Sequence, residues 1–234
     1  MKERPVIFNG EMVRAILDGR KTQTRRVMKV QPESSGFGLR FITESLNNRD
    51  TGKYFWSQSD AFGINKPRSK PFLCPFGQVG DRLWVREAYQ GPLFNFDQME
   101  TYLEDTSKFE RPEFCEYRAD GGKTPEYYDA DDNLRYGWKP SIHMPRWASR
   151  ITLEITAVRV ERLNDISEED AEAEGIDMEA LYDSQDCYDC IADHNMTGRP
   201  TVTGAFKYLW ESIYGVDSWN ANPWVWAISF RRVK

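Results

Sequence analysis

The chain has 234 residues, of which 40% are hydrophobic, 14% aromatic and 29% charged, and its net charge is −6 at pH 7. These values are ordinary for a folded globular protein and exclude a disordered or fibrous chain. No apolar run approaches the roughly 18 residues of a membrane span, and the first residues lack the apolar stretch of a secretory signal. We therefore expect a cytoplasmic protein without a membrane partner, folded as a single domain over residues 1–234.

The charge is unevenly distributed along the chain. Residues 161–186 hold eleven acidic side chains against one base, Arg162, a net charge of −10, so the rest of the chain carries +4. A polyanionic partner such as nucleic acid is therefore compatible with the acidic total. The four cysteines are too few and too scattered for a disulfide framework, which agrees with a reducing compartment.

Two short elements open the chain. Residues 4–8 (RPVIF) have the composition of a short strand. Residues 10–18 have the apolar spacing of an amphipathic helix, and Gly19 is the expected C-terminal stop. The cationic segment GRKTQTRR, residues 19–26, therefore begins where this helix ends.

Two irregular insertions interrupt the regular pattern. Residues 31–79 and 91–140 are rich in turn-forming residues and isolated aromatics and have no sustained period, which predicts long ordered loops. Between them, residues 80–90 predict a turn followed by a strand in which apolar positions alternate with Trp84 and Arg86.

The C-terminal third carries the most regular patterns. Apolar residues alternate from 151 to 160 with one change of phase, as a β-bulge produces. Ser167 can cap a short acidic helix that Gly175 ends. Residues 206–215 predict another helix, and residues 224–230 alternate as a closing strand.

Strands separated by long loops, with only short helices, predict a mainly β protein of the α+β class. The expected architecture is a small twisted β-barrel decorated by helices and by the two insertions. The sequence contains no internal repeat and no Walker or dinucleotide-binding glycine loop. We therefore expect no cofactor.

The cations Arg20, Lys21, Arg25 and Arg26 allow several interpretations. They can complement the dipole of the preceding helix, bind a phosphate, or include a catalytic lysine. An extended backbone would place Lys21 and Arg25 on one face and Thr24 on the other, whereas a turn would make Lys21 and Thr24 neighbours. A free lysine has a pKa of about 10.4. To act as a base at pH 7, Lys21 needs a pKa lowered by roughly 3, and the charge of one nearby arginine could lower it by about 2.

Four segments share a pattern with a known family: GRKTQTRR, the strand after GDRLWV, the helix ISEEDAEAEGI and the C-terminal strand. They resemble the ASCH domain family, a set of PUA-like β-barrels linked to RNA. A closer resemblance is to longer ASCH-domain proteins common in tailed bacteriophages and prophages. It is carried by the segments FNGEMVRAILDGRKTQTRR, GQVGDRLWVRE, WKPSIHMPRWASRITLEIT and LWESIYG. The similarity covers most of the chain and implies a PUA-like fold.

A small bacterial ASCH relative removes the acetyl group from N(4)-acetylcytidine with a lysine, a threonine and a glutamate. Its G-R-K-T-x-T motif is matched by GRKTQT, which contains Lys21 and Thr24, and its glutamate corresponds to Glu174 in EEDAEAEG. The resemblance implies an amidohydrolase that cleaves a C–N bond of an acylated or otherwise modified nucleoside or nucleobase. In it Thr24 would attack or orient a water, and either Lys21 or Glu174 would be the base.

The segment WKPSIHMPRWASR, residues 138–150, is a candidate binding loop because it places tryptophans, a histidine and cations between prolines. Such residues stack on bases and contact phosphate or sugar, or alternatively pack on the barrel with their arginines in solvent. The residues expected to contact the nucleoside or nucleic acid are Arg20, Arg25, Arg26, Trp84, Arg86, His143, Arg146 and Trp147. RNA is favoured over DNA, and the alternative function is a non-catalytic RNA- or DNA-binding module or a nuclease of phage origin.

Cys187, Cys190 and His194 have the spacing of half a zinc site. Cys74 or Cys115 would complete it. Because half a signature is also compatible with unpaired thiols in a polar loop, we predict no metal.

Overall fold

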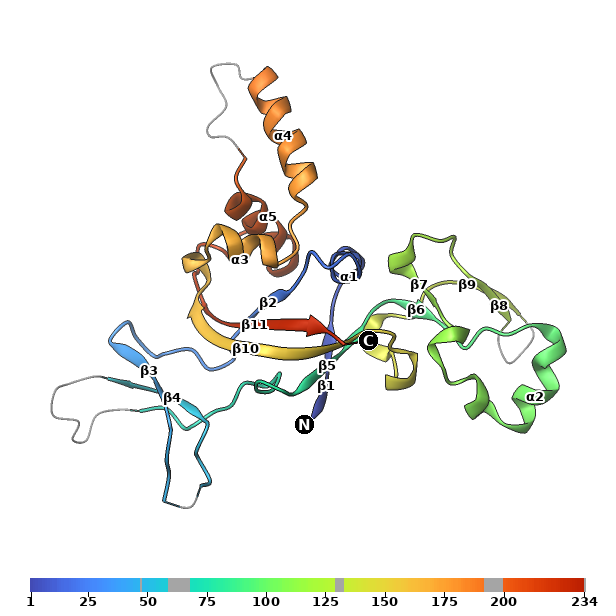
Figure 1. The fold of residues 1–234 in the computed structure, drawn as a ribbon, viewed down its shortest axis with the longest axis horizontal. Helices are drawn as coiled ribbons and strands as arrows, with labels where there is room; N and C mark the ends of the chain where they lie inside the picture. The colour runs from blue at the N-terminus through green and yellow to red at the C-terminus, as the bar shows by residue number, and fades with distance from the viewer. Residues whose placement is uncertain (47, 59–67, 129–132, 192–199, 234) are drawn as a thin grey trace.

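The computed structural model describes residues 1–46, 48–58, 68–128, 133–191 and 200–233. They form an α+β protein in which short helices surround a five-stranded mixed sheet of order β1–β5–β10–β11–β2 (Figure 1). The strands are β1 (Glu3–Ile7), β2 (Gln23–Val27), β5 (Arg82–Arg86), β10 (Thr152–Arg162) and β11 (Trp224–Arg232). The α+β class with short helices agrees with the prediction.

The centre of the sheet is the antiparallel pair β10 and β11. β10 spans 11 residues and also pairs antiparallel with β5. Its register against β11 shifts between Ile155 and Ala157, which confirms the predicted bulge. β1 runs parallel to β5 at one edge of the sheet, and β2 runs antiparallel to β11 at the other.

The sheet curls but stays open in the described part of the chain, so the closed barrel expected from the strand pattern is not formed there. Helix α1 (Gly10–Leu17) connects the two edge strands. In the described residues no strand pairing joins these two edges, and the Arg26 guanidinium of β2 donates to the Ile7 carbonyl of β1 at 2.6 Å. The GRKTQT segment therefore lies at an open edge.

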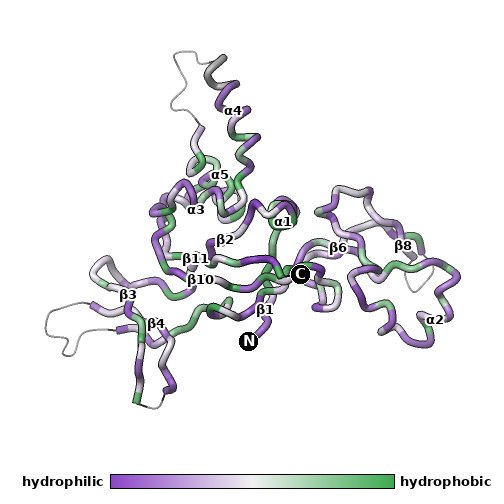
Figure 2. Tube along the Cα trace, viewed as in Figure 1, coloured by the Kyte–Doolittle hydropathy of each residue, from purple (hydrophilic) through white to green (hydrophobic). Residues whose placement is uncertain are grey.

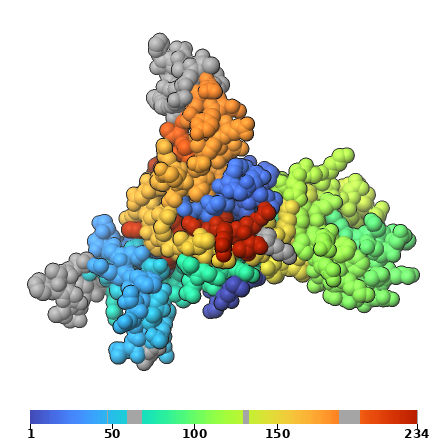
Figure 3. All heavy atoms as spheres, viewed as in Figure 1, coloured from blue at the N-terminus to red at the C-terminus, as the bar shows by residue number. Residues whose placement is uncertain are grey.

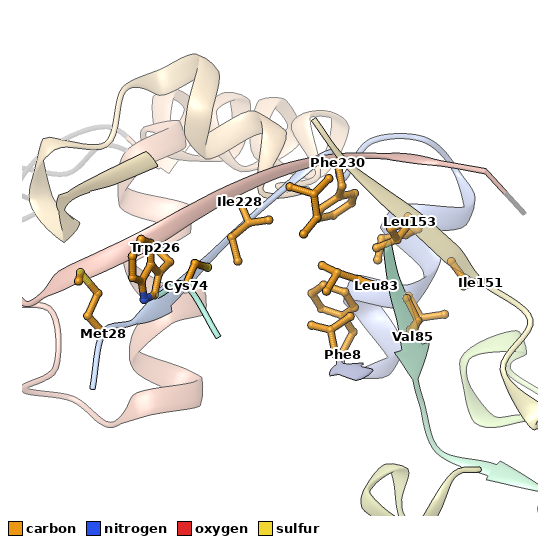
Figure 4. Close-up of a cluster of buried hydrophobic side chains, with 14 of the residues drawn as sticks. Phe8, Met28, Cys74, Leu83, Val85, Ile151, Leu153, Trp226, Ile228 and Phe230 are labelled. Atoms are coloured by element: carbon orange, nitrogen blue, oxygen red, sulfur yellow. The ribbon is translucent and has the colours of Figure 1, made fainter. Parts of the chain in front are cut away.

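One apolar core covers the inner face of the sheet (Figure 4). Alternate strand residues point into it, because successive side chains on a strand face opposite sides. Its buried strand members are Val6, Leu83, Val85, Leu153, Ile155, Trp226, Ile228 and Phe230. Burial of this apolar surface, at about 25 cal/mol per Å², is the main contribution to the stability of the sheet.

The helix ends follow local sequence signals. The Asn9 side chain caps α1 by accepting a hydrogen bond of 2.8 Å from the helix backbone, and Gly19, with φ of +81°, follows its end. Ser167 caps α3 (Glu168–Ala173) in the same way at 3.1 Å. Gly175, with φ of +93°, follows the end of α3 as predicted.

A second apolar cluster lies under α5 (Val202–Tyr214), where Phe206 and Trp210 pack near Leu163. Helix α4 (Met178–Ile191) extends away from this region at the top of Figure 1. Sequence patterning does not predict α4, because its acidic and polar residues obscure a helical period (Figure 2). None of the helices in the described ranges is long and apolar enough to cross a membrane.

The two insertions form separate lobes beside the sheet, coloured blue to cyan and green in Figure 3. Trp56 of the first insertion is 1% exposed and reaches the main core. The second insertion is tied to the sheet by Arg150, whose guanidinium binds Glu87 at 2.9 Å and Asp120 at 2.7 Å. The insertions were predicted to be loops, but they contain short regular elements: β3 (Phe37–Phe41), β4 (Tyr54–Gln58), α2 (Met99–Glu104), β7 (Glu116–Tyr117), β8 (Glu126–Tyr128) and β9 (Leu134–Tyr136). Strand β6 (Tyr89–Gln90) precedes the second insertion and pairs with β7.

Candidate active site

The GRKTQT segment is held between α1, α3 and the sheet. The Lys21 N–H donates to the Ala15 carbonyl of α1 at 2.9 Å, and the Thr22 N–H donates to the Ala173 carbonyl of α3, also at 2.9 Å. From Gln23 onward the chain is strand β2, so the extended alternative applies to the second half of the motif. These backbone bonds bring Lys21 against the C-terminal end of α3.

Lys21 and Glu174 form a buried ion pair. The Lys21 Nζ atom donates to Glu174 Oε2 at 2.8 Å and to the Glu174 backbone oxygen at 2.7 Å. The two side chains are 0% and 3% exposed, respectively. Glu172, on the same helix, is exposed to solvent. The fold thus joins the motif lysine to the glutamate at the end of the acidic helix, although 153 positions separate them in sequence.

Gly175 makes the close approach of these segments possible. A Cβ atom at this position would lie 2.8 Å from Lys21 Cβ and 3.0 Å from Ala15 Cβ. Its φ of +93° is also a conformation that L side chains rarely adopt. Glycine is therefore required here both for the backbone turn and for the space beside Lys21.

Arg25 extends the ion pair into a larger buried network. Its Nη1 atom lies 3.2 Å from Glu174 Oε1, and its Nη2 atom lies 2.7 Å from Asp170 Oδ2 and also binds Glu161. Gln23 joins the network by donating to Asp170 at 3.0 Å. The Arg25 side chain is 0% exposed. Arg25, predicted from sequence to bind substrate or nucleic acid, therefore neutralises carboxylates inside the protein, because its guanidinium does not face solvent.

Cations match the carboxylates of this network. Arg159 adds a further cation at its exposed rim by binding Asp170 at 2.6 Å, with its side chain 47% exposed. Lys21, Arg25 and Arg159 thus face the same number of acidic groups. Burial of charge is tolerated when each charge is paired and hydrogen-bonded, and it is strongly unfavourable when a partner is removed.

The pKa of Lys21 lies below its ordinary value. Burial is the largest cause, because it disfavours the charged ammonium. The Glu174 carboxylate opposes this fall through its charge and hydrogen bond, while the nearby Arg26 and Arg25 charges lower the pKa further. Lys21 therefore gives up its proton more readily than an exposed lysine, which is the property that proton transfer near neutral pH requires.

Thr24 faces the opposite side of β2 from Arg25. It pairs with Ile228 of β11, whose side chain belongs to the main core, and opposed residues of an antiparallel pair share a face. Its side chain is buried. The hydrogen bonds of the described part of the chain include none from Thr24 to Lys21 or Glu174. The structure thus brings two of the predicted catalytic residues together and places the third on the core side of the strand.

Comparison with known proteins does not assign a family. No family model, curated protein or solved structure matched this chain. The interpretation of the site therefore depends on its own residues and geometry.

A cavity of about 450 Å³ adjoins the buried ion pair. It is bounded by α1, by Arg20, by the turn that follows α3 and by α5, and Glu174 and Gly175 are part of its wall. The Arg20 guanidinium is held there by the Gly175 carbonyl at 3.3 Å and by Asp18 at 3.1 Å. Arg20 is thus the predicted binding residue that lies at this cavity.

Three other predicted binding residues gather on the face of β5 that points away from the core. The Arg86 and Arg146 guanidinium carbons lie 5.5 Å and 6.0 Å from the Trp84 ring centroid, within the range of cation–π contacts. Arg86 also donates to the Ile142 carbonyl, and Arg146 binds Glu3 at 3.0 Å. We call the group of Trp84, Arg86 and Arg146 the Trp84 platform.

The remaining predicted binding residues have mixed surroundings. The Arg26 guanidinium lies 5.2 Å from the Phe8 ring centroid, at the junction of the two edge strands. His143 is exposed. Trp147 packs against a buried cluster that includes Met144. This corresponds to the alternative in which the tryptophans of residues 138–150 pack on the protein instead of stacking on bases.

The half-signature for zinc cannot be placed in the site. The side chains of Cys187 and Cys190, and His194 as a whole, lie outside the described residues. Within the described ranges, no group of three or more His, Cys, Asp or Glu side chains could hold a metal ion.

Sequence reasoning missed two of the three acidic partners of Arg25, namely Glu161 and Asp170, and the cavity wall formed by α5. The excess of acidic residues in 161–186 was a signal for these partners, since three of its members pair with the buried arginine. No local pattern marked the cavity wall, because helix α5 joins it only through tertiary packing.

Proposed function

We propose that this protein belongs to the ASCH family and removes an acyl group from a modified nucleoside such as N(4)-acetylcytidine. The observation that carries the proposal is the buried Lys21–Glu174 pair, with the lowered pKa of Lys21, beside a small-molecule-sized cavity. Both residues stand at positions that the resemblance to the small amidohydrolase singles out. We interpret the curled, open sheet as a variant of a PUA-like barrel.

The proposed reaction is hydrolysis of an amide. Water forms a C–O bond at the acyl carbon and gives one proton to Lys21 in its deprotonated form, which burial favours. The C–N bond then breaks, and that proton passes to the leaving nitrogen, which yields a carboxylic acid and the amine of the nucleoside. Glu174 holds Lys21 Nζ in position and stabilises the ammonium that forms during the reaction.

In this scheme Thr24 does not act as the nucleophile. A hydroxyl nucleophile needs a base within hydrogen-bond reach. The described hydrogen bonds place Lys21 on Glu174, and Thr24 lies beside Ile228 on the other face of β2.

A deacylation assay tests this function. The purified chain is incubated with N(4)-acetylcytidine and a panel of acylated nucleosides, and loss of the acyl group is followed by mass spectrometry. We expect Lys21→Met to lower turnover by at least about 100-fold, the usual contribution of a positioned proton-transfer group. Lys29→Met, at an exposed position after β2, is the matched control and should retain full activity. Absence of turnover by the parent chain on every substrate would overturn the proposal.

The Trp84 platform supports a second candidate function, binding of single-stranded RNA or DNA. An indole ring flanked by two guanidinium groups can stack on a base while the cations contact phosphate. A salt series tests it, because release of counterions makes the affinity of a phosphate-binding surface fall steeply with salt. An affinity that does not change with salt would contradict this candidate.

A further inference from the structure

The cavity beside Glu174 has the size of a site for one small ligand. Its volume of about 450 Å³ lies within the range of about 300–1,000 Å³ that is usual for small-molecule pockets. Its walls come from α1, the turn after α3 and α5, so elements from both ends of the chain line it. This form differs from the long open groove that follows the backbone of a nucleic-acid strand.

The charged side chains that line the cavity balance one another. Arg14 and Arg20 are offset by Glu11 and Asp177, and the Glu174 carboxylate is already engaged in its ion pair. A cavity of this kind has no excess of cations to attract a chain of phosphates. Its carboxylates can instead accept hydrogen bonds from hydroxyl groups such as those of a ribose.

Helix α5 presents an exposed aromatic ring to the cavity. Tyr208 lines the cavity and is 80% exposed, whereas Phe206 and Trp210 on the inner side of the same helix are buried. Leu209 and Met12 add apolar surface to the same walls. A ring of this kind, above apolar side chains, is a stacking surface for a nucleobase.

We propose that this cavity binds one free nucleoside, with its base on Tyr208, its sugar hydroxyls near Glu11 and Asp177, and its acylated end toward Glu174. The identity of the acyl group rests on the proposed function, whereas the choice of a free nucleoside over a nucleotide or polymer rests on the cavity. Gly175 lines the cavity and packs directly against Lys21, so the acylated end would lie within one residue of the buried pair.

Calorimetric titration of the full chain tests this assignment. The probes are cytidine, N(4)-acetylcytidine, its 5′-monophosphate and a short single-stranded RNA that carries the same modified base. We expect the nucleoside to bind at least as tightly as the monophosphate and the RNA. Tyr208→Ala should weaken nucleoside binding by about 5- to 100-fold, the usual range for loss of one stacking ring, and Tyr208→Phe should preserve it. Tyr128→Ala is the matched control, because Tyr128 is 70% exposed and lies in the second insertion.

The outcomes separate this inference from the proposed function. If the chain deacylates nucleosides but Tyr208→Ala leaves both Kd and KM unchanged, the cavity assignment is overturned and the hydrolase proposal stands. If nucleosides bind through Tyr208 but none is hydrolysed, the hydrolase proposal is overturned and the cavity assignment stands. Tighter binding of RNA than of the nucleoside, or no nucleoside binding at all, overturns the cavity assignment.

Discussion

Cations in two regions of the sheet have opposite surroundings. At the β2 edge, the Lys21 and Arg25 side chains are 0% exposed and bind carboxylates. Beside β5, on the face that points away from the core, Arg146 is 43% exposed and lies near the half-buried Trp84 ring. The same residue types thus form a buried ionic network in one place and an accessible surface in the other.

This contrast determines what each region can do. A buried ion pair responds strongly to loss of one partner and shifts the pKa of its members, so it suits proton transfer. An exposed cation is screened by salt and contributes little to stability, so it suits reversible contact with a charged partner. The following predictions start with the largest expected effect on stability.

Removal of the Glu174 charge should destabilise the protein most. In Glu174→Gln, Lys21 and Arg25 lose a buried counter-charge, and we expect the free energy of unfolding to fall by about 3–5 kcal/mol. Urea denaturation followed by circular dichroism measures this change. The control is Glu172→Gln on the same helix, where the exposed side chain should change stability by no more than about 0.5 kcal/mol. Equal effects at the two positions would contradict the buried pair.

A methyl group at Gly175 should have the next largest effect. Gly175→Ala adds a Cβ atom 2.8 Å from Lys21 Cβ at a residue with φ of +93°. We expect a loss of at least about 2 kcal/mol from backbone strain together with crowding. Gly121→Ala is the control, because its φ of +77° is similar but nothing lies within 4 Å of the added atom. A loss no larger than that of the control, in the same urea assay, would show that the turn does not press on Lys21.

Stability should also change with pH through Lys21. Its pKa is lowered in the folded state by burial, whereas an unfolded lysine titrates at about 10.4. Between these two values the unfolded chain binds more protons, so folding stability rises with pH, by at most about 1.4 kcal/mol per pH unit. Lys21→Met removes this gain. Urea denaturation from pH 7 to 10 should therefore show the parent chain gaining stability relative to Lys21→Met, and parallel curves would refute the lowered pKa.

Substitution of Trp84 should change stability least and nucleic-acid affinity most. Because the Trp84 side chain is only partly buried, we expect Trp84→Ala to reduce stability by about 1 kcal/mol or less. Its affinity for single-stranded RNA at low salt should fall by about 5-fold or more through loss of stacking. Fluorescence anisotropy measures this affinity, with Phe96→Ala, at an 87% exposed ring in the second insertion, as the control. Unchanged affinity in Trp84→Ala would remove the platform from nucleic-acid binding.

Local patterns predicted the main elements around the central sheet but none of the strands and helices inside the two insertions, which were expected to be loops. Alternation of apolar residues marked β10, β11 and β5, and the phase change near Ile155 marked the bulge, because a strand side chain faces the core at every second position. Caps and glycines marked the ends of α1 and α3 for a similarly local reason. Helix α4 escaped prediction because its acidic and polar residues obscure a helical period, and the open edge of the sheet escaped it because strand pairing depends on distant segments.

In the candidate site, too, local sequence patterns predicted some features and tertiary packing decided others. The residue types and spacing of GRKTQT, with the resemblance they carry, were enough to select Lys21 and Glu174 as partners. They were not enough to place Arg25, which the sequence put with the binding residues and the fold buries against Glu161 and Asp170. A cationic side chain has the same local signature on a surface and in a buried network, and only its neighbours distinguish the two.

The sequence by itself determined where α1, α3, α5 and the strands β5, β10 and β11 lie, since caps, glycines and the periods of helix and strand act within a few positions. Tertiary structure alone decided that Lys21 Nζ meets Glu174 across 153 positions, that Arg25 is buried, and that α1 and α5 line a cavity beside them. The reason is physical: burial and charge neutralisation depend on which distant segments pack together, and burial is the largest cause of the lowered pKa of Lys21.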